Sequence, residues 1–114
     1  MKKPWWVDRR GTRVAVNIIS ATTTTLVAAV AGKTVRILRY SLTAGAAGAG
    51  TFVFKSSTAG NITGLRNIPN DGALGEVFTG GEECTEGEAL EIVTTGTDLD
   101  GDVWYEIVST GATV

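Results

Sequence analysis

Short runs of Val, Ile, Thr, Leu and aromatic residues, separated every few positions by Gly, Asn or Asp, fill residues 14–110 of this 114-residue chain. β-Branched and aromatic residues favour extended strands, whereas Gly, Asn and Asp favour the tight turns between strands. Helices need longer periodic segments than these interruptions leave. We therefore predict an all-β domain.

Alternation of side chains is clearest in the last of these runs. Val103, Tyr105 and Ile107 fall on one face of the predicted strand, and Trp104, Glu106 and Val108 fall on the other. About eight short strands in one domain of this size predict a two-sheet β-sandwich of jelly-roll or Greek-key type, and we favour the jelly roll. The predicted strands are Val14–Ile19, Thr23–Val30, Thr34–Leu42, Thr51–Ser56, Asn61–Leu65, Leu74–Phe78, Ala89–Thr94 and Asp102–Val108.

Two segments predict local features of this fold. In Thr34–Leu42 the apolar positions change phase after Ile37, and we expect a β-bulge or a crossing between sheets there. The segment Gly45–Gly50 is rich in glycine, but no Lys-Ser/Thr pair completes a phosphate-binding loop and its spacing is not that of dinucleotide-binding sequences. We expect it to be a hairpin loop between Thr34–Leu42 and Thr51–Ser56.

The residue types present exclude several classes of enzyme. The chain has no His, which excludes imidazole acid–base catalysis, histidine-containing triads and histidine-ligated metals. Its one Cys, Cys84, excludes an internal disulfide and a multi-thiolate zinc site. Cys84 also lies among acids, which raise the pKa of a thiol and disfavour a reactive thiolate. We expect no enzymatic activity, no cofactor and no metal.

Two acidic clusters near the C-terminus have ordinary structural explanations. Asp98, Asp100 and Asp102 could supply oxygen ligands to Ca²⁺, but an EF-hand loop has its glycine in the sixth position and Gly101 comes too early for that. We expect a polar turn before the last strand instead. The cluster Glu82–Glu88 could hold paired carboxylates across a cleft, as glycosidases do, but nothing in the sequence forms that cleft. We expect a solvated loop.

Charge is divided unevenly along the chain, although the formal net charge is only −2. All 10 Lys and Arg lie in residues 1–66, together with a single acid, Asp8. All the remaining acids of the 12 lie in residues 67–114. These unlike poles could attract each other between neighbouring copies. A strand order that places acidic strands beside basic ones would instead neutralise them within one domain. The sequence leaves both possibilities open.

Residues 1–13, MKKPWWVDRRGTR, differ in composition from the rest of the chain. Pro4 and Gly11 discourage regular structure, so we expect an extended N-terminal arm at 1–13, followed by the β-sandwich domain at 14–114. We name residues 1–13 the basic–aromatic arm. Its two tryptophans and five bases are the candidate partner-binding residues: Lys2, Lys3, Trp5, Trp6, Arg9, Arg10 and Arg13.

The composition of the arm fits several kinds of partner. We favour docking on another protein subunit, because Trp and Arg are enriched at protein interfaces and two exposed tryptophans impair solubility. Nucleic acid could be bound by base stacking on Trp and phosphate contacts to Lys and Arg, and the same composition could lie at a membrane interface. We expect neither nucleic acid nor a membrane as the partner, and packing of the arm on its own domain is the remaining alternative.

Targeting signals are not indicated. No apolar stretch of signal-peptide length follows Met1, and the longest apolar run, around Leu26–Ala31, is far shorter than the roughly 20 residues that span a bilayer. We expect a protein that is made in a reducing cytoplasm.

Four segments carry a further signal: Thr22–Leu38 with Tyr40 and Leu42, Phe52–Ser56, Gly87–Gly96 and Gly101–Val108. They resemble small virion proteins of tailed bacteriophages. The resemblance covers residues 18–110 and does not include the arm. It implies a structural β-sandwich module, often a jelly roll, which occurs in capsid decoration (cement) proteins and in neck, tail and fibre positions. It transfers no functional residues, because such modules carry out no chemistry.

This resemblance leads us to expect a non-enzymatic capsid decoration protein on the capsid surface, bound to the major capsid protein and to neighbouring copies of itself as a trimer. A neck, tail or fibre component is the alternative within the virion. A carbohydrate-binding module is the alternative outside it. Trp104 and Tyr105 are the candidate sugar platform, although alternation places their rings on opposite faces.

Overall fold

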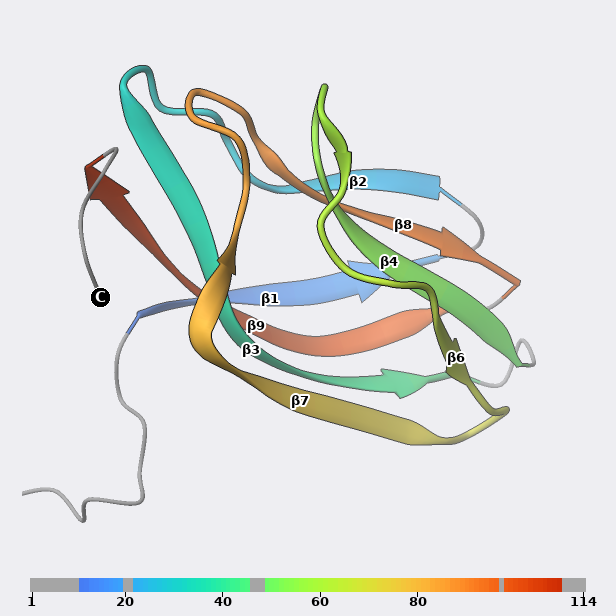
Figure 1. The fold of residues 1–114 in the computed structure, drawn as a ribbon. Coiled ribbons are helices and arrows are strands. Elements are labelled where there is room, and N and C mark those ends of the chain that lie inside the picture. The colour runs from blue at the N-terminus through green and yellow to red at the C-terminus, as the bar shows by residue number, and fades with distance from the viewer. Residues whose placement is uncertain (1–10, 20–21, 46–48, 97, 110–114) are drawn as a thin grey trace, which may run out of the picture.

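The computed structural model of the chain describes residues 11–19, 22–45, 49–96 and 98–109, and these residues contain no helix (Figure 1). The all-β class predicted from the sequence is therefore confirmed. The strands are β1 (Thr12–Ile18), β2 (Thr22–Val27), β3 (Lys33–Ala44), β4 (Gly50–Ser56), β5 (Gly60–Asn61), β6 (Arg66–Ile68), β7 (Ala73–Glu83), β8 (Leu90–Thr95) and β9 (Leu99–Ser109).

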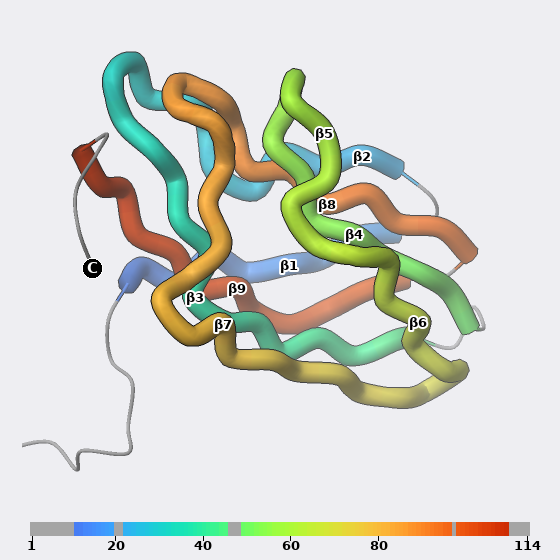
Figure 2. The backbone as a smooth tube through the Cα atoms, viewed as in Figure 1, coloured from blue at the N-terminus to red at the C-terminus, as the bar shows by residue number. Residues whose placement is uncertain are grey.

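The strands form two antiparallel sheets with jelly-roll topology. The first sheet has the order β1-β9-β3-β7, and the second has the order β2-β8-β4-β5, with β6 also pairing with β4. The pairs β1–β9, β2–β8, β3–β7 and β4 with β5 and β6 are nested, as in one long folded hairpin. Rolling that hairpin into two layers adds the pairs β3–β9 and β4–β8, and the layers can be followed in Figure 1 and Figure 2. This arrangement confirms the predicted jelly-roll sandwich.

Alternating apolar residues from both sheets make the core. Phe52 and Phe54 of β4 are fully buried, and their ring centroids lie 5.4 and 5.3 Å from that of Tyr40 of β3. Each buried phenylalanine contributes about 1.5–3 kcal/mol of stability. Val103 of β9 is also in the core, and Tyr105 packs against it. The predicted facing of Phe52 with Phe54, and of Val103 with Tyr105, is confirmed.

β3 contains the irregularity that its change of phase predicts. Leu38 is an extra residue between Ile37 and Arg39, and the register with both β7 and β9 shifts at this position. The bulge lets Ile37 before it and Tyr40 after it both join the core. Without the extra residue, one half of β3 would turn its apolar side chains away from the second sheet.

One predicted connection and one predicted strand are wrong. The segment Gly45–Gly50 leads from β3 in the first sheet to β4 in the second, so it is a connection between sheets and not a hairpin loop; residues 46–48 lie outside the described part of the chain. Of the predicted strand Asn61–Leu65, only Asn61 lies in a strand, as the last residue of β5, and residues 62–65 are the break between β5 and β6. The backbone N–H groups of Ile62 and Thr63 both donate to the carbonyl oxygen of Phe54, which curls this segment against β4.

The predicted polar turn at Asp98–Asp102 is also wrong, because β9 begins at Leu99. Asp100 pairs with Thr43 of β3, and Asp102 pairs with Ser41. Gly101 makes this possible, since it adopts a φ of +143° where β9 passes very close to the backbone of β3. Composition suggested a turn, but the glycine serves a close approach between strands.

Candidate interaction surface

The structure describes only Arg13 among the predicted partner-binding residues. Lys2, Lys3, Trp5, Trp6, Arg9 and Arg10 lie outside the described residues. Arg13, which the sequence assigns to the basic–aromatic arm, lies in β1 opposite Trp104 of β9. Its guanidinium forms an ion pair of 2.8 Å with Asp102. The regular sheet therefore begins at Thr12, before the predicted boundary, and the domain itself holds Arg13.

Gly11 marks the point at which the chain enters the domain. Its φ of +92° lies in the region that favours glycine. A Cβ atom at this position would lie 2.8 Å from Cδ1 of Leu38 and 2.7 Å from the carbonyl oxygen of Tyr105. Leu38, the bulge residue of β3, is only 1% exposed. Gly11 therefore lies next to the bulge of the first sheet.

A row of outward-facing side chains crosses the first sheet beside that point. The register pairs Arg13 with Trp104, Trp104 with Arg39 of β3, and Arg39 with Val77 of β7. The guanidinium carbon of Arg39 lies 4.1 Å from the Trp104 ring centroid. Such a cation–π contact contributes about 0.5–1 kcal/mol at an exposed site. Val77 ends the row with a 67% exposed side chain.

This row disfavours Trp104 and Tyr105 as a sugar platform. Arg39 covers one face of the Trp104 ring, while Tyr105 packs against the core on the other side of the sheet. The predicted opposite orientation of the two rings is confirmed. A flat sugar surface needs aromatic faces that are open on the same side.

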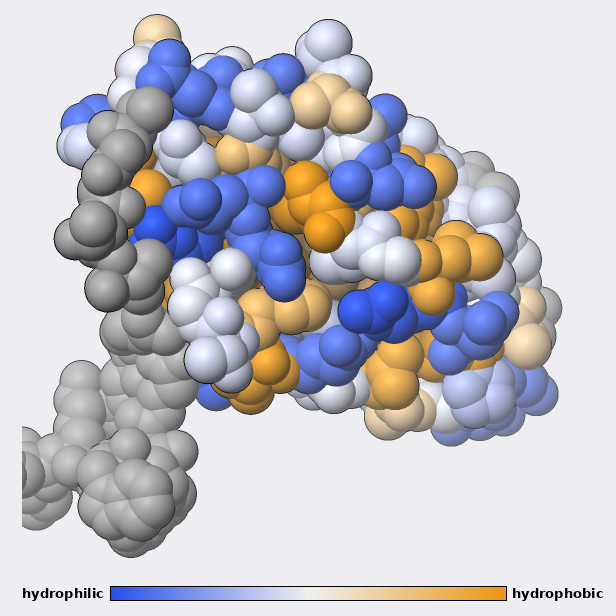
Figure 3. Space-filling model, viewed as in Figure 1, coloured by the Kyte–Doolittle hydropathy of each residue, from blue (hydrophilic) through white to orange (hydrophobic). Residues whose placement is uncertain are grey.

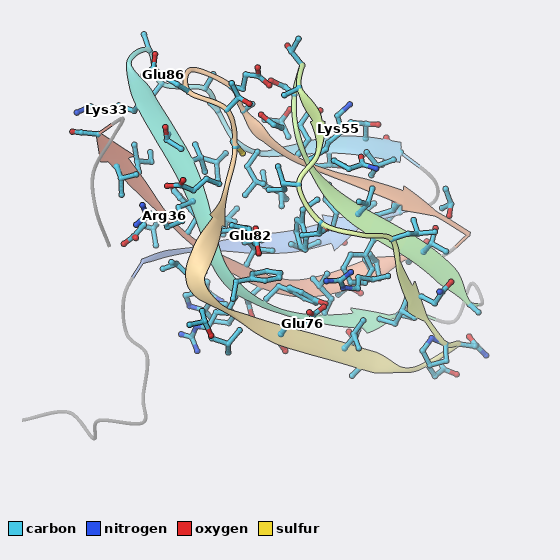
Figure 4. All side chains as sticks on the ribbon, in the orientation of Figure 1. Lys33, Arg36, Lys55, Glu76, Glu82 and Glu86 are labelled. Atoms are coloured by element: carbon cyan, nitrogen blue, oxygen red, sulfur yellow. The ribbon has the colours of Figure 1, made fainter. Side chains whose placement is uncertain are left out.

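Arg36 lies on the same outer face, on the other side of the bulge, and is buried between two carboxylates. Its side chain is 4% exposed and forms ion pairs of 2.8 Å with Glu83 of β7 and 2.9 Å with Glu106 of β9. The hydrogen bonds with Glu83 and Glu106 raise the pKa of Arg36. Figure 4 shows Arg36 on β3. The prediction that Glu82–Glu88 is a solvated loop is wrong for Glu82 and Glu83, which both belong to β7.

Every ion pair within the described residues joins a base from residues 1–66 to an acid from residues 67–114. The pairs already described follow this rule. So do Lys55 of β4 with Glu91 of β8, at 3.8 Å, and Arg66 of β6 with Glu76 of β7, at 2.5 Å. Any ion pair between described residues has to join the two halves, because the described bases all lie before residue 67 and the described acids all lie after residue 66. The nested topology is what brings these partners side by side. The basic and acidic halves therefore meet within one domain.

Acids outnumber bases in the described domain, and several of these acids form no ion pair within it. Lys33 forms no ion pair among the described residues, but its Nζ donates to Oγ of Ser109 at 3.1 Å. Several carboxylates form no ion pair within the same residues, among them Asp71, Glu82, Glu86, Glu88 and Asp100. Residues 11–109 carry six of the 10 bases and all the acids except Asp8, a formal charge of −5, and residues 1–10 hold the other four bases.

A polar cluster that the sequence analysis missed joins the two sheets. The Tyr40 hydroxyl and the Arg66 guanidinium both donate to the Glu76 carboxylate. Hydrogen bonds from Arg66 and Tyr40 lower the pKa of Glu76, while burial and the Glu76 charge raise the pKa of Tyr40. Arg66 belongs to the second sheet and the other two residues to the first. We name this cluster the Tyr40–Arg66–Glu76 clasp; no motif in the sequence connects its members.

Glu88, which lies between β7 and β8, orders the turn between β4 and β5. One Glu88 oxygen accepts hydrogen bonds from the Ser56 hydroxyl at 2.7 Å and from the backbone N–H groups of Thr58 and Ala59, each at 2.8 Å. These bonds lower the pKa of Glu88, so this acid is structural and not merely solvated. Burial raises the pKa of the nearby Cys84 thiol to about 11, which keeps it protonated at neutral pH.

On the face drawn in Figure 3, apolar side chains occur in small groups that polar side chains separate. Among the residues with a described position, no cluster of Cys, Asp and Glu is arranged to hold a metal ion. A search of the same residues finds no helix long and apolar enough to cross a membrane.

Comparison with protein-family models and with curated proteins gives no match. Among solved structures, the endospore appendages of Bacillus, described as disulfide-linked pili, share 13% identity over 98% of this chain and 100% of theirs, with a TM-score of 0.49. The C-terminal domain of the sugar-binding protein EclA shares 16% identity over 91% of this chain and 82% of its own, with a TM-score of 0.41. The virus-like particle of the extra small virus of the prawn Macrobrachium rosenbergii shares 14% identity over 90% and 83%, with a TM-score of 0.39. Similarity at this level transfers no function to this chain.

Proposed function

We propose that this chain is a structural protein of a bacteriophage virion, and specifically a capsid decoration protein that binds the assembled head. The distribution of charge partners supports the proposal. Each of the six bases in the described domain has a partner within that domain: Asp102 for Arg13, Ser109 for Lys33, Glu83 and Glu106 for Arg36, Trp104 for Arg39, Glu91 for Lys55 and Glu76 for Arg66. The remaining bases stand beside Trp5 and Trp6 in residues 1–10.

An acidic domain whose bases all have internal partners, joined to a basic–aromatic arm, suits a protein whose work is attachment. Trp and Arg are the residues that contribute most at protein interfaces. In the proposed mechanism, the arm anchors each copy on the major capsid protein, and the sandwich covers a seam between neighbouring capsomers. Copies also touch one another on the shell. Many weak attachments on one shell then act together to stabilise the head.

Removal of the arm tests this proposal. The chain is truncated before Gly11, and in a second variant Trp5 and Trp6 are both changed to Ala. Because β1 begins at Thr12, both proteins keep the whole sandwich. We expect both to lose binding to purified capsids, measured by co-sedimentation, while their circular dichroism stays that of the full chain. A matched Trp104→Phe variant keeps its arm and is expected to bind normally.

Normal decoration of capsids by the truncated protein would contradict the proposal. Its copy number separates the two virion locations, because a decoration protein is present in numbers comparable with the major capsid protein and a neck or fibre component in far fewer. Salt-dependent binding of DNA that disappears with the arm would replace docking by nucleic-acid recognition.

A further inference from the structure

The outermost strand of the second sheet, β2, has a free edge. Figure 1 shows β2 beside β8, its partner, and no strand within the described residues pairs with its other side. The sequence of β2 is TTTTLV, and its threonines at positions 22, 23 and 25 are exposed. An edge of this kind presents unpaired backbone N–H and C=O groups, which can pair with another strand.

The other sheet edges carry protection that β2 lacks. β7 bends at Gly80 and Gly81, which have φ values of +76° and +82°, and it carries Glu82 and Glu83. The edge opposite β2 in the second sheet is divided into the short strands β5 and β6, and β1 carries Arg13. Charges, bends and short strands are the devices that keep sheet edges from associating. β2 has no charged residue and no proline.

We propose that β2 pairs antiparallel with β2 of a second copy of this chain across a two-fold axis. Its bulge against β8 lies between Thr25 and Val27, so Thr22–Thr25 forms a regular ladder. A two-fold axis places this run opposite itself, threonine against threonine, and such cross-strand pairs are favourable. No like charges oppose one another in this arrangement, in contrast to the pairing of β7 with its own copy.

A neighbouring apolar side chain adds to the interface. Ile19 directly follows β1, which contacts β2, and it is 76% exposed. Ile19 therefore stands on the same side of the sandwich as the free edge. Covering it when two copies pair removes apolar surface from water, which adds to the new backbone hydrogen bonds.

The inference concerns the edge of the domain and holds whether or not the arm binds a capsid. It predicts a dimer as the self-associated unit, in contrast to the trimer expected from the resemblance. A four-residue ladder is short, so the pairing is reversible in solution. It strengthens where copies are held side by side on one surface, because the local concentration is then high.

Sedimentation velocity of the full chain over a range of concentrations tests the pairing. The wild type is compared with Thr23→Lys/Thr25→Lys, which places like charges across the two-fold axis. The control Thr79→Lys changes an exposed threonine of β7. We expect the wild type to form dimers and the control to match it. The double variant should dimerise at least about tenfold more weakly. In the wild type, amide hydrogen exchange at Thr23–Thr25 should slow as the concentration rises.

A wild type that stays monomeric at high concentration, or that forms trimers, overturns the pairing. So does equal weakening by the Thr79→Lys control, or amide exchange at β2 that does not change with concentration. Capsid co-sedimentation keeps the two proposals apart. The arm truncation loses capsid binding but keeps the dimer, whereas the β2 variant loses the dimer and keeps the arm-mediated attachment at reduced avidity.

Discussion

Arg36 and Arg39 are close together on β3, yet the domain accommodates their charges in different ways. Arg36 is buried between Glu83 and Glu106, whereas Arg39 stacks on Trp104. Nε of Arg39 is buried and has no hydrogen-bond partner among the described residues. A buried donor without a partner costs about 1–3 kcal/mol, which offsets the gain from stacking. The bulge lies between the two arginines, so their side chains contact different neighbouring residues.

Glu76 links the stability of the fold to pH. Arg66 and Tyr40 lower its pKa in the folded protein, whereas a glutamate in an unfolded chain titrates at about 4.3. The stability that Glu76 contributes is therefore complete above the unfolded pKa and is lost as the pH falls through the folded one. We expect Glu76→Gln to cost on the order of 1 kcal/mol at pH 7, a modest value because the clasp is partly exposed. Urea unfolding between pH 7 and pH 3 measures this.

The shape of the pH profile identifies the cause. The wild type should lose stability steeply on acidification, and Glu76→Gln should lose less, so the two curves converge at low pH. Glu86→Gln, a change at an exposed acid without an ion pair among the described residues, is the matched control and should follow the wild type. Parallel curves for wild type and Glu76→Gln would contradict a role for the clasp in acid stability.

At the scale of elements, local patterns predicted the strands whose side chains alternate. Phe52 with Phe54 and the bulge near Leu38 could be inferred from the spacing of apolar residues, because that spacing is a local consequence of facing one core. The break after Asn61 could not, since hydrogen bonds to a residue of β4 decide it. Gly101 was misassigned because glycine supports both turns and close strand approaches, and only the neighbouring strand distinguishes them.

The close approach at Gly101 predicts a large effect of a small change. A Cβ atom there would lie 2.1 Å from the carbonyl oxygen of Ser41 and 3.0 Å from Cα of Leu42, both of which belong to a backbone that cannot move aside. We expect Gly101→Ala to destabilise the domain by about 3 kcal/mol or more, combining backbone strain with overpacking. Thermal and urea unfolding measure the loss.

Gly87→Ala is the control that separates strain from collision. Gly87 has a φ of +77°, but a Cβ atom there would meet nothing within 4 Å. This substitution should cost only about 1–2 kcal/mol, the strain of the left-handed conformation. Equal losses for the two variants would show that contact between β9 and β3 is not what requires Gly101.

At the scale of the whole molecule, the topology decides what the charge pattern means. The sequence shows two poles, and it left open whether they meet between copies or within one. Nested pairing brings β1 beside β9 and β3 beside β7, so bases such as Arg13 find acids such as Asp102 inside the same domain. No local pattern contains this information, because the partners are far apart in the sequence and only the strand order brings them together.

That internal neutralisation predicts how attachment to a capsid depends on salt. If the bases of residues 1–10 supply the electrostatic part of docking, capsid affinity should fall as the Debye length shrinks from about 10 Å at 0.1 M salt to about 3 Å at 1 M. A variant with Lys2, Lys3, Arg9 and Arg10 changed to Gln should bind more weakly at low salt and respond little to added salt. The Trp5→Ala/Trp6→Ala variant keeps these charges, so any residual binding should keep the salt dependence.

Co-sedimentation with capsids across a salt series measures the affinity of the wild type and of both variants. Urea unfolding should give the same stability for the domain in all three proteins. An unchanged salt response in the charge variant would place the electrostatic contact on the sandwich and not on the arm.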